Sequence, residues 1–339
     1  MQVAILELIV PLGRQIATTA GAVRSKPAPV HQVRDLQVDF TPSPKSPEFQ
    51  ATCAVVVTYH PDPGLFDRLK ILSPQVHSTV IVDNGSSDQT VQCLREIASS
   101  LGSHLILNSR NEGVARALNR GAGWAVAQGY SWMLMLDQDT TVSPRIVASL
   151  AEIFLRDPSS GNLAIIGSNY TDKATGELKT EFGQAGVVPA QEMVSVLTSG
   201  SLLSLAAYQA VGPFRDDFFI DCVDHEYCLR ARSRGFRVVM TSHAVMTHGI
   251  GHLTRHRFLW KTVGTSNHEP ARQYFMSRNT WILAREYLIN EPRWIFGYLW
   301  AWVKSIVVIC LFERSRFKKL KNITYGCIDG LLGRTKMTS

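Results

Sequence analysis

The chain has 339 residues, of which 45% are hydrophobic and 19% charged. This balance is typical of a globular protein with a buried core and excludes a wholly disordered chain. The six cysteines are scattered and form no CxxC pair, so neither a zinc site nor a disulfide framework is indicated.

The net charge of +7 is unevenly distributed, because residues 254–339 hold fifteen Lys or Arg against five Asp or Glu. That asymmetry indicates an acidic partner, a phosphorylated ligand or an anionic membrane. Nucleic acid is the least supported, because no zinc finger or RNA-binding signature is present.

Residues 1–50 are predicted to form a poorly ordered arm or linker. This part contains "TPSPKSPEF" and lacks long periodicity, as linkers do. The opening "VAILELIVPL" is interrupted by Glu7 and follows no basic residue, so it is a poor signal peptide and too short to span a membrane. A short docking helix at residues 3–18 is the alternative.

From residue 53 the chain alternates between strand-like and helix-like segments. "CAVVVTYH", "TVIVD", "HLIL" and "WMLMLD" are apolar runs typical of buried parallel strands, and helical patterns such as "LFDRLKIL" lie between them. This alternation predicts an α/β domain with a parallel sheet. Ligands of such sheets bind beyond the carboxyl ends of the strands. Asp83, Asn111, Asp137 and Asp139 all fall at that edge.

The acids in "LDQD" suggest a divalent cation. The turn after the first strand is "TYHPDPG", with no GxGxxG, and the chain has no Walker lysine motif. Asp137 and Asp139 are separated by Gln138, and paired carboxylates offer hard oxygen ligands to Mg²⁺ or Mn²⁺. A solvated turn is the alternative interpretation of this short motif.

A second group of acids occurs in "FFIDCVDHEYCLRARSRG". Asp221, Asp224 and Glu226 lie just before or within an expected helix start, where the helix dipole favours negative charge. The functional alternative is a general base held at the helix N-terminus. Arg230 and Arg232 are expected to pair with these acids.

Together these segments resemble the inverting family 2 glycosyltransferases. The matching pieces are "VVVTYHP", "VIVDNGSSDQT", "NEGVARALNRG", "MLMLDQD", "TSGSLLS", "FFIDCVDHEYCLRARSRG" and "HGIG". "LDQD" and "NHEPARQYFMSRN" are most similar to the bacterial rhamnosyltransferases of that family. The resemblance implies a GT-A fold, with a Rossmann-like nucleotide-binding half and a mainly parallel central sheet. The domains expected are residues 51–252 for catalysis and 253–339 for a basic, helical, membrane-associating region.

The resemblance assigns nucleotide-sugar binding to the strand ends and to the NxGxxxAxN segment. The residues implied are Thr58, Tyr59, Asp83, Asn111, Gly113, Arg116, Asn119, Asp137 and Gln138. Asp83 is expected to accept a hydrogen bond from the base, and Gly113 to allow close approach of the backbone. Arg272 and Arg278 are candidates for pairing with the diphosphate, and a solvated helix face is their alternative.

The resemblance also assigns the metal and the base. Asp139 and His248 are expected to bind Mg²⁺ or Mn²⁺, which would neutralise the departing diphosphate. Asp137 would contact the ribose or a metal-bound water. Asp224 aligns with the base that removes the acceptor proton. Asp221 is the alternative base, because Val223 replaces the usual Glu and Asp221 is an extra acid.

The C-terminal part predicts contact with a membrane surface. Residues 294–312 are apolar but broken by Lys304, and "ERSRFKKLKN" follows. This pattern favours a helix in the interface, with basic residues attracting anionic lipid. The aromatic residues expected at headgroup depth are Trp294, Tyr298, Trp300 and Trp302, and the basic residues are Arg314, Arg316, Lys318, Lys319 and Lys321. A helix buried against the catalytic domain and a transmembrane span are the alternatives.

The resemblance implies transfer of L-rhamnose from dTDP-L-rhamnose to a lipid-linked O-antigen or other cell-surface polysaccharide precursor. The expected location is peripheral, on the cytoplasmic face of the bacterial inner membrane. The alternatives are a rhamnosyltransferase that adds a second rhamnose to a rhamnolipid, and an inactive protein that binds a glycan or sugar nucleotide. The missing Gly-rich turn argues against a dehydrogenase. The oligomeric state is not indicated.

Overall fold

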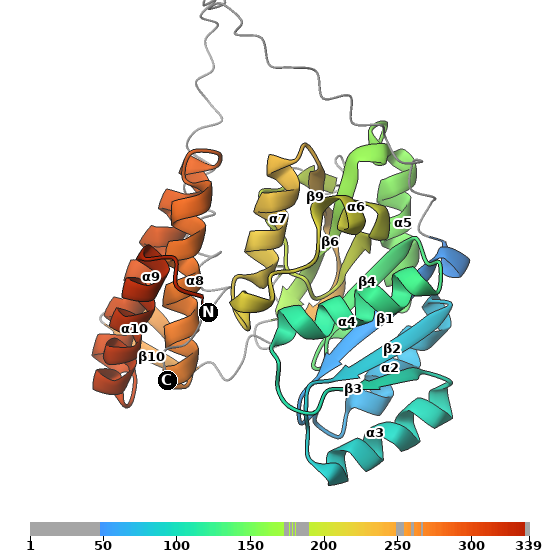
Figure 1. Ribbon diagram of the computed structural model, residues 1–339, viewed down its shortest axis with the longest axis horizontal. Coiled ribbons are helices and arrows are strands. Elements are labelled where there is room, and N and C mark those ends of the chain that lie inside the picture. The colour runs from blue at the N-terminus through green and yellow to red at the C-terminus, as the bar shows by residue number, and fades with distance from the viewer. Residues whose placement is uncertain are drawn as a thin grey trace, which may run out of the picture.

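The protein consists of an α/β domain followed by a unit of three helices (Figure 1). The computed structural model describes residues 48–172, 176, 178, 180, 190–248, 254–258, 261–265 and 267–335. The expected N-terminal arm and its alternative docking helix lie almost wholly outside these residues.

A mixed sheet forms the centre of the α/β domain. Its strands are β1 (Thr52–Thr58), β2 (Ser78–Asp83), β3 (His104–Leu107), β4 (Trp132–Asp137), β5 (Thr141–Val142), β6 (Leu163–Asp172), β7 (Ala190–Glu192), β8 (Ser201–Ser204) and β9 (Arg237–His248). Their order is β3-β2-β1-β4-β8-β6-β9-β5, and β7 also pairs with β9. The first four strands in this order run parallel, β8 is antiparallel to both its neighbours, and β6 and β9 are parallel.

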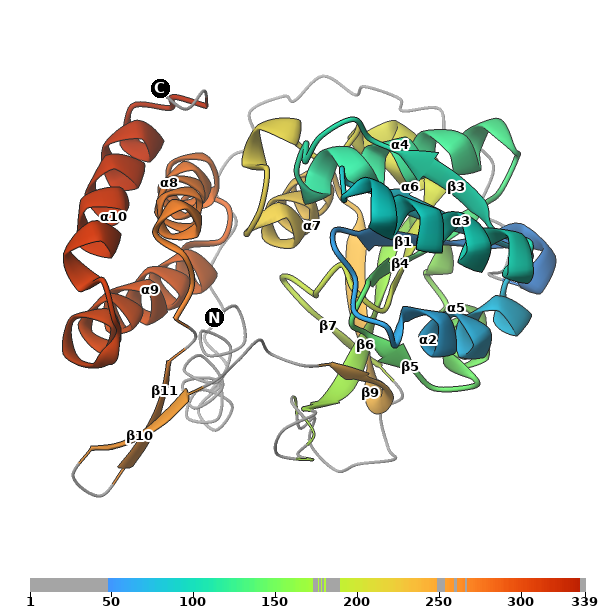
Figure 2. The same ribbon diagram turned by 90° about the horizontal axis from the view of Figure 1, so that it is seen from below.

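Helices cover both faces of the sheet. On one face lie α4 (Val114–Ala127), α6 (Leu205–Val211) and α7 (Val223–Ser233), and on the other α2 (Leu65–Leu72), α3 (Asp88–Leu101) and α5 (Ile146–Arg156) (Figure 2). Val55 and Val57 of β1 pack toward the first set, and Val56 toward the second. This is why the parallel strands appear in the sequence as unbroken apolar runs.

The carboxyl ends of β1, β2 and β4 meet at one edge. Register pairs Thr58 with Asp83 and Val57 with Asp137. The expected edge therefore exists, and it places residues that are 25 and 80 positions apart side by side. The short 3-10 helices η1 (Phe49–Ala51), η2 (Ser73–Gln75), η3 (Ser160–Asn162) and η4 (Asp216–Phe218) complete the domain.

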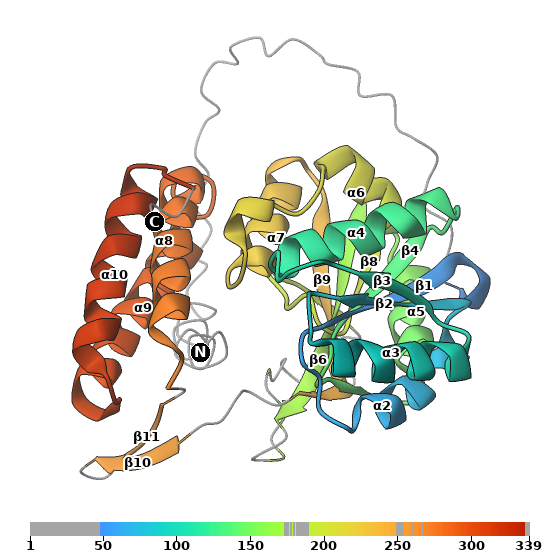
Figure 3. The same cartoon turned by 60° about the horizontal axis from the view of Figure 1, so that its bottom comes forward.

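A hairpin and three helices form the C-terminal unit, which stands beside α7 (Figure 3). They are β10 (Thr254–Phe258), β11 (Lys261–Thr265), α8 (Pro270–Tyr287), α9 (Pro292–Phe312) and α10 (Arg316–Leu331). Two glycines of α10 bring it against α8: a Cβ on Gly326 would lie 2.3 Å from the Tyr274 carbonyl oxygen, and one on Gly330 2.4 Å from that of Arg278. Within the described residues, α9 is the one helix that is long and apolar enough to cross a membrane by length and composition.

The aromatic residues expected at headgroup depth are partly misassigned. Tyr298 and Trp302 are buried, and Trp294 stacks on Tyr298 with ring centroids 5.0 Å apart. Both of those rings also contact His225 of α7. The inner face of α9 needs large apolar side chains to pack on the rest of the protein, so only Trp300 of the four is exposed. Lys319 is also buried, paired with Glu313 at 2.7 Å.

Candidate active site

Asp83 organises the turn that follows β2. Its buried carboxylate accepts hydrogen bonds from the Thr58 hydroxyl at 3.1 Å, the Gly85 amide at 3.2 Å, and the amide and hydroxyl of Ser86 at 2.8 and 2.6 Å. These donors fix the shape of the edge at β1 and β2. The expected contact between Asp83 and a nucleotide base stays a prediction.

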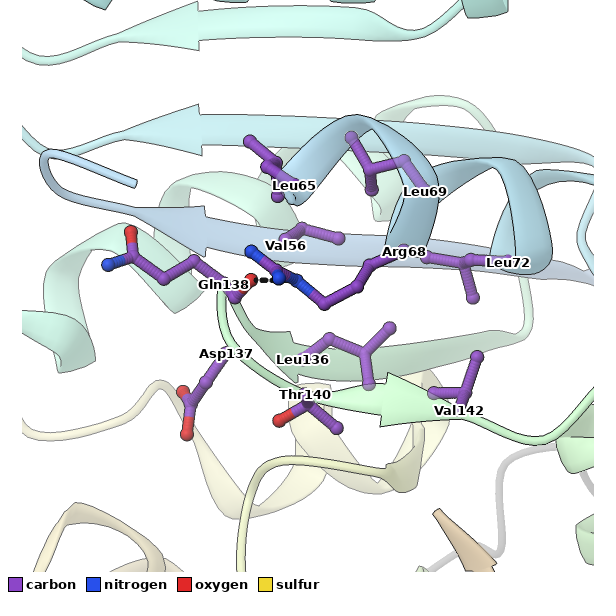
Figure 4. A pocket seen from close by; sticks show the side chains of 10 residues that line it. All are labelled: Val56, Leu65, Arg68, Leu69, Leu72, Leu136, Asp137, Gln138, Thr140 and Val142. Atoms are coloured by element: carbon purple, nitrogen blue, oxygen red, sulfur yellow. Dashed lines mark hydrogen bonds between the residues drawn. The ribbon is translucent and has the colours of Figure 1, made fainter. Parts of the chain in front are cut away.

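Gln138 joins the end of β4 to the end of β1. The Tyr59 amide donates to Gln138 Oε1 at 2.7 Å, and Gln138 Nε2 donates to the Tyr59 carbonyl at 3.1 Å. Arg68 of α2 donates to the Gln138 carbonyl at 2.7 Å (Figure 4). The Tyr59 ring is exposed. The segment that carries both acids of "LDQD" is therefore fixed at its centre.

A small pocket lies behind this segment. Its walls are mainly apolar side chains of α2, β1, β4 and β5, joined by four polar residues, Arg68, Asp137, Gln138 and Thr140. Figure 4 shows the Asp137 carboxylate turned away from Arg68 and from α2. The carboxylate therefore points away from the guanidinium of Arg68, although Asp137 is among the residues that line the pocket.

Asp137 and Asp139 differ in their surroundings. The Asp137 amide donates to Ser199 Oγ at 3.0 Å, and Ser199 also shares a hydrogen bond with Thr140 at 2.7 Å. Asp139 is exposed in the turn between β4 and β5. β5 pairs Thr141 with Thr247 in antiparallel register. Continuing this register by one residue places the main chain of His248 beside that of Thr140. The side chain of His248 lies outside the description.

Gly113 makes a close approach, but to the protein itself. Its φ is +89°, and a Cβ there would lie 2.5 Å from the Phe219 carbonyl oxygen. The adjacent Val114 amide donates to that same oxygen at 2.7 Å. Asn111 accepts from the Gly113 amide and from the side chain of Asn84, both at 3.0 Å. The segment thus holds the backbone of Phe219, and its contact with a nucleotide stays a prediction.

Asn119 and Arg116 lie further along α4 and contact the chain near η4. The Asn119 side chain donates to the Phe214 carbonyl and to Asp216 Oδ1, both at 2.7 Å, and accepts from the Phe214 amide at 2.8 Å. Arg116 lies 3.6 Å from Glu112 and 3.9 Å from Asp216. Both residues contact other parts of the protein. These contacts do not test whether Asn119 or Arg116 also binds the nucleotide sugar, and that role stays a prediction.

The two candidate bases occupy different environments. Asp221 forms a two-pronged ion pair with Arg272, with both N–O distances at 2.9 Å. Asp224 is buried at the start of α7 and accepts from the His225 amide at 2.8 Å. Burial raises the pKa of Asp224, although neighbouring His225 opposes the rise. A raised pKa is a common property of a carboxylate that must accept a proton.

The other charged groups here have structural contacts. Glu226 pairs with Arg230 at 2.9 Å and accepts from Tyr287 at 3.1 Å, as expected for Arg230. Arg232 was expected to pair with the same acids, but it contacts Glu192 and Glu291 instead, because it lies a further half-turn along α7. Arg278 is buried rather than on a solvated face, and it donates to the carbonyls of Asp217 and Thr335.

The loop before α7 has an unusual backbone. Phe219, Asp221 and Cys222 have φ values of 52°, 63° and 60°, a region that non-glycine residues rarely adopt. Such conformations persist only where the surroundings enforce them, and they often occur at functional sites. The sequence did not reveal this loop, nor its main contact, the buried side chain of Asn279 on α8. Asn279 is the last residue of the motif "RQYFMSRN", and this position in the motif is the sequence signal that could have drawn attention to it.

Comparison with known proteins finds a family model that matches part of the chain. Residues 64–203 match the model described as glycosyl transferase family 2. This part of the chain is therefore similar to a family 2 glycosyltransferase domain. The matched segment includes α2, the carboxyl ends of β2 and β4, and the turn at Ser199.

Similar proteins agree with this assignment. A dTDP-rhamnosyl transferase of Shigella flexneri is 26% identical over 297 residues, which is 83% of this transferase and 96% of the relative. A polyprenol monophosphomannose synthase of Mycolicibacterium smegmatis is 28% identical over 131 residues, covering 37% and 48% of the two chains. The structure of a mannosyltransferase of Pyrobaculum calidifontis with GDP-mannose and Mn²⁺ covers 97% of this chain and 95% of its own, with a TM-score of 0.50 and 13% identity. The predicted GT-A fold is confirmed.

Proposed function

We propose that this glycosyltransferase moves L-rhamnose from dTDP-L-rhamnose to a hydroxyl of a lipid-linked O-antigen or other cell-surface polysaccharide precursor, with inversion at the anomeric carbon. The observation that supports the donor best is the similarity to the dTDP-rhamnosyl transferase, which extends over nearly the whole of that relative. The acceptor rests on the resemblance of the sequence motifs.

The donor nucleotide would bind at the edge formed by β1, β2 and β4. Support comes from the cross-links there, from Asp83 to its turn and from Gln138 to Tyr59. A rigid edge lowers the conformational entropy lost when a ligand binds. The exposed ring of Tyr59 offers an apolar surface beside it. Arg272 would add positive charge for the diphosphate, since its guanidinium is always protonated and is partly exposed.

The residues at this edge fit a divalent cation that is bound together with its nucleotide. Within the described part of the chain no three His, Cys, Asp or Glu side chains cluster as a metal site. Asp139, with His248, would provide two protein ligands to Mg²⁺ or Mn²⁺, a number that leaves positions for phosphate oxygens. When bound, the ion would offset the negative charge of the leaving diphosphate.

Asp224 would remove the proton from the attacking hydroxyl, and Asp221 is the alternative. The raised pKa of Asp224 supports the first assignment. The ion pair of Asp221 with Arg272 opposes the second, because the carboxylate of Asp221 is already occupied.

The C-terminal unit would hold the transferase on an anionic membrane. The exposed apolar residues of α9 recur at helical spacing: Phe296, Trp300, Val303, Val307 and Leu311. The exposed or half-exposed charges of α9, α10 and the turn between them are all basic: Arg293, Lys304, Arg314, Arg316, Lys318 and Lys321. The acids Glu313 and Asp329 are buried and paired. An apolar stripe bordered by basic charge is typical of a helix lying in a membrane interface.

The experiment that tests the reaction is a panel of sugar nucleotides with purified protein, Mg²⁺ or Mn²⁺, and lipid-linked acceptors. Release of dTDP from dTDP-L-rhamnose, faster than release from UDP- and GDP-sugars, supports the proposal. Faster release from another sugar nucleotide would show that its sugar, and not rhamnose, is the one transferred. Binding without turnover on any donor would favour the inactive binding protein.

For the membrane, the test is sedimentation with phosphatidylglycerol and phosphatidylcholine vesicles. Val307→Glu places a charge in the apolar stripe and should reduce binding to phosphatidylglycerol vesicles. Leu155→Glu, at an exposed position on α5, is the matched control and should bind as the wild type does. Equal binding to both lipids by all three proteins would overturn the assignment.

A further inference from the structure

A buried side chain of the C-terminal unit, Asn279, contacts the backbone of the strained loop between η4 and α7 at three carbonyl groups. Asn279 of α8 is fully buried, and its Nδ2 lies 2.9 Å from the Phe218 carbonyl, 3.0 Å from that of Ile220 and 2.9 Å from that of Asp221. These carbonyls bracket two of the three positions with positive φ, Phe219 and Asp221.

Arg278 fixes the orientation of Asn279. Arg278 Nε and Nη2 donate to Asn279 Oδ1 at 3.1 and 2.9 Å. A carboxamide whose oxygen accepts from a cation must present its NH₂ group to the other side. The orientation that points both N–H bonds at the loop carbonyls is therefore enforced. Arg278 also donates to the Asp217 carbonyl, one residue before the first of these three.

The opposite side of the loop is held by α4. The Phe219 carbonyl accepts a hydrogen bond from the Val114 amide. The same carbonyl lies so close to Gly113 that a side chain at position 113 would clash with it. The loop is thus fixed between the segment at the predicted nucleotide edge and the C-terminal unit. Asp221 belongs to the loop, and Asp224 follows it in the first turn of α7.

We propose that Asn279, oriented by Arg278, is a positioning residue that sets the loop geometry on which the catalytic acid depends. This inference rests on the proposed transfer reaction. Apart from Arg278, which orients it, the Asn279 side chain acts through the backbone of residues 218–221. It therefore affects the step in which the acceptor proton is removed, and not the binding of the nucleotide.

The physical reason is that the loop conformation is costly without these contacts. The left-handed region strains the backbone of any non-glycine residue, and three such residues lie within four positions. Without the donors of Asn279 the backbone can relax to ordinary φ values. Asp221 and the start of α7 then shift, and a displacement of about 1 Å in a reacting group can cost on the order of 10²-fold in rate.

The test compares full-length Asn279→Ala with wild type. We expect kcat to fall on the order of 10²-fold, while the Kd for dTDP changes less than about twofold and the number of dTDP sites per protein stays the same. Hydrogen exchange should increase at residues 218–222. Asn290→Ala, in the exposed turn after α8, is the matched control and should alter none of these quantities.

The outcomes separate this proposal from the proposed function. An unchanged kcat, or a loss of dTDP sites in parallel with kcat, overturns the positioning role, since the second result indicates a partly unfolded protein. If Asn279→Ala does not fold, Asn279→Ser, which keeps one hydroxyl donor, should retain dTDP binding with a reduced kcat. If wild type transfers no sugar, the proposed function fails, and hydrogen exchange alone then decides whether Asn279 holds the loop.

Discussion

Arg272 of α8 and Asp221 of the loop before α7 form a two-pronged ion pair, with Nε–Oδ2 and Nη2–Oδ1 distances of 2.9 Å. The Asp221 side chain is 5% exposed, whereas that of Arg272 is 36% exposed. The pair ties the C-terminal unit to the loop, and Asp137 lies near enough to help raise the pKa of Arg272. Arg272 therefore joins α8 to the loop that carries one candidate base, Asp221.

Removing Arg272 should destabilise the protein through Asp221. Arg272→Ala leaves a buried carboxylate without its cation, and we expect a loss of about 1–3 kcal/mol in the free energy of unfolding. Asp221→Asn combined with Arg272→Ala should recover part of that loss. Urea unfolding of the two single variants and the double variant measures the coupling. Additive losses would show that the two residues do not interact.

A weaker Kd for dTDP in Arg272→Ala, with no change in Asp221→Asn, would indicate that Arg272 also contacts the diphosphate.

If Asp139 binds the metal ion, transfer should require a divalent cation and should be lost when Asp139 is replaced. Asp139→Ala should remove nearly all transfer and weaken donor binding, because the diphosphate loses its counter-ion. Product formation is measured over a range of Mn²⁺ and Mg²⁺ concentrations, with EDTA as the blank. Asp67→Ala, at an exposed position of α2, should behave as wild type does. Full activity in excess EDTA would reject the metal role of Asp139 and His248.

The base assignment predicts a change in kcat without a change in affinity. Asp224→Asn should lower kcat by at least about 10²-fold, the lower range for a positioned base. The Kd for dTDP should change by less than about threefold, since a base acts only as the bond forms. Asp221→Asn should lower kcat much less. If Asp221→Asn is the inactive variant and Asp224→Asn works, the base is Asp221.

Burial of Asp224 also predicts how stability depends on pH. Burial raises its pKa in the folded protein above the ordinary value of 3.8, so folding favours the protonated form. The carboxylate therefore lowers stability increasingly as the pH rises from about 4 through the raised pKa. Asp224→Asn removes this dependence, and the variant should gain stability relative to wild type at pH 7 but not at pH 4. Urea unfolding at both pH values measures the difference, and an equal difference at both would contradict the prediction.

Gly113 should tolerate no side chain. Gly113→Ala would place Cβ 2.5 Å from the Phe219 carbonyl oxygen and requires an unfavourable φ of +89°. We expect a lower melting temperature and a lower kcat, because the loop must move. Gly123→Ala is a control in the same helix, where a Cβ meets nothing within 4 Å. It should raise stability by up to about 1 kcal/mol. Similar behaviour of the two variants would show that contact with Phe219 is unimportant.

The sequence predicts the first half of the fold well and the site only partly. The strands β1, β2 and β4 and the helices α2 and α3 follow from apolar runs bounded by Gly, Pro and Asp, which are local signals. The roles of Asn119 and Asn279 depend on backbone groups 95 and 58–61 residues away, and no local pattern encodes such distances. The exposed face of α9 was misassigned for a similar reason: which aromatic residues are buried depends on α7 and α8.

The close packing of α10 on α8 affects how shortened proteins should be interpreted. Gly326 and Gly330 bring α10 against the main chain of α8 at Tyr274 and Arg278, and Arg278 orients the side chain that holds the catalytic loop. A truncation before α9 would remove the exposed apolar stripe that is proposed to contact the membrane, but it would also remove the packing of α10 against α8. An inactive truncated protein would therefore not demonstrate that catalysis requires lipid. Single charge substitutions on the outer face of α9 separate the two effects, because they leave the inner contacts in place.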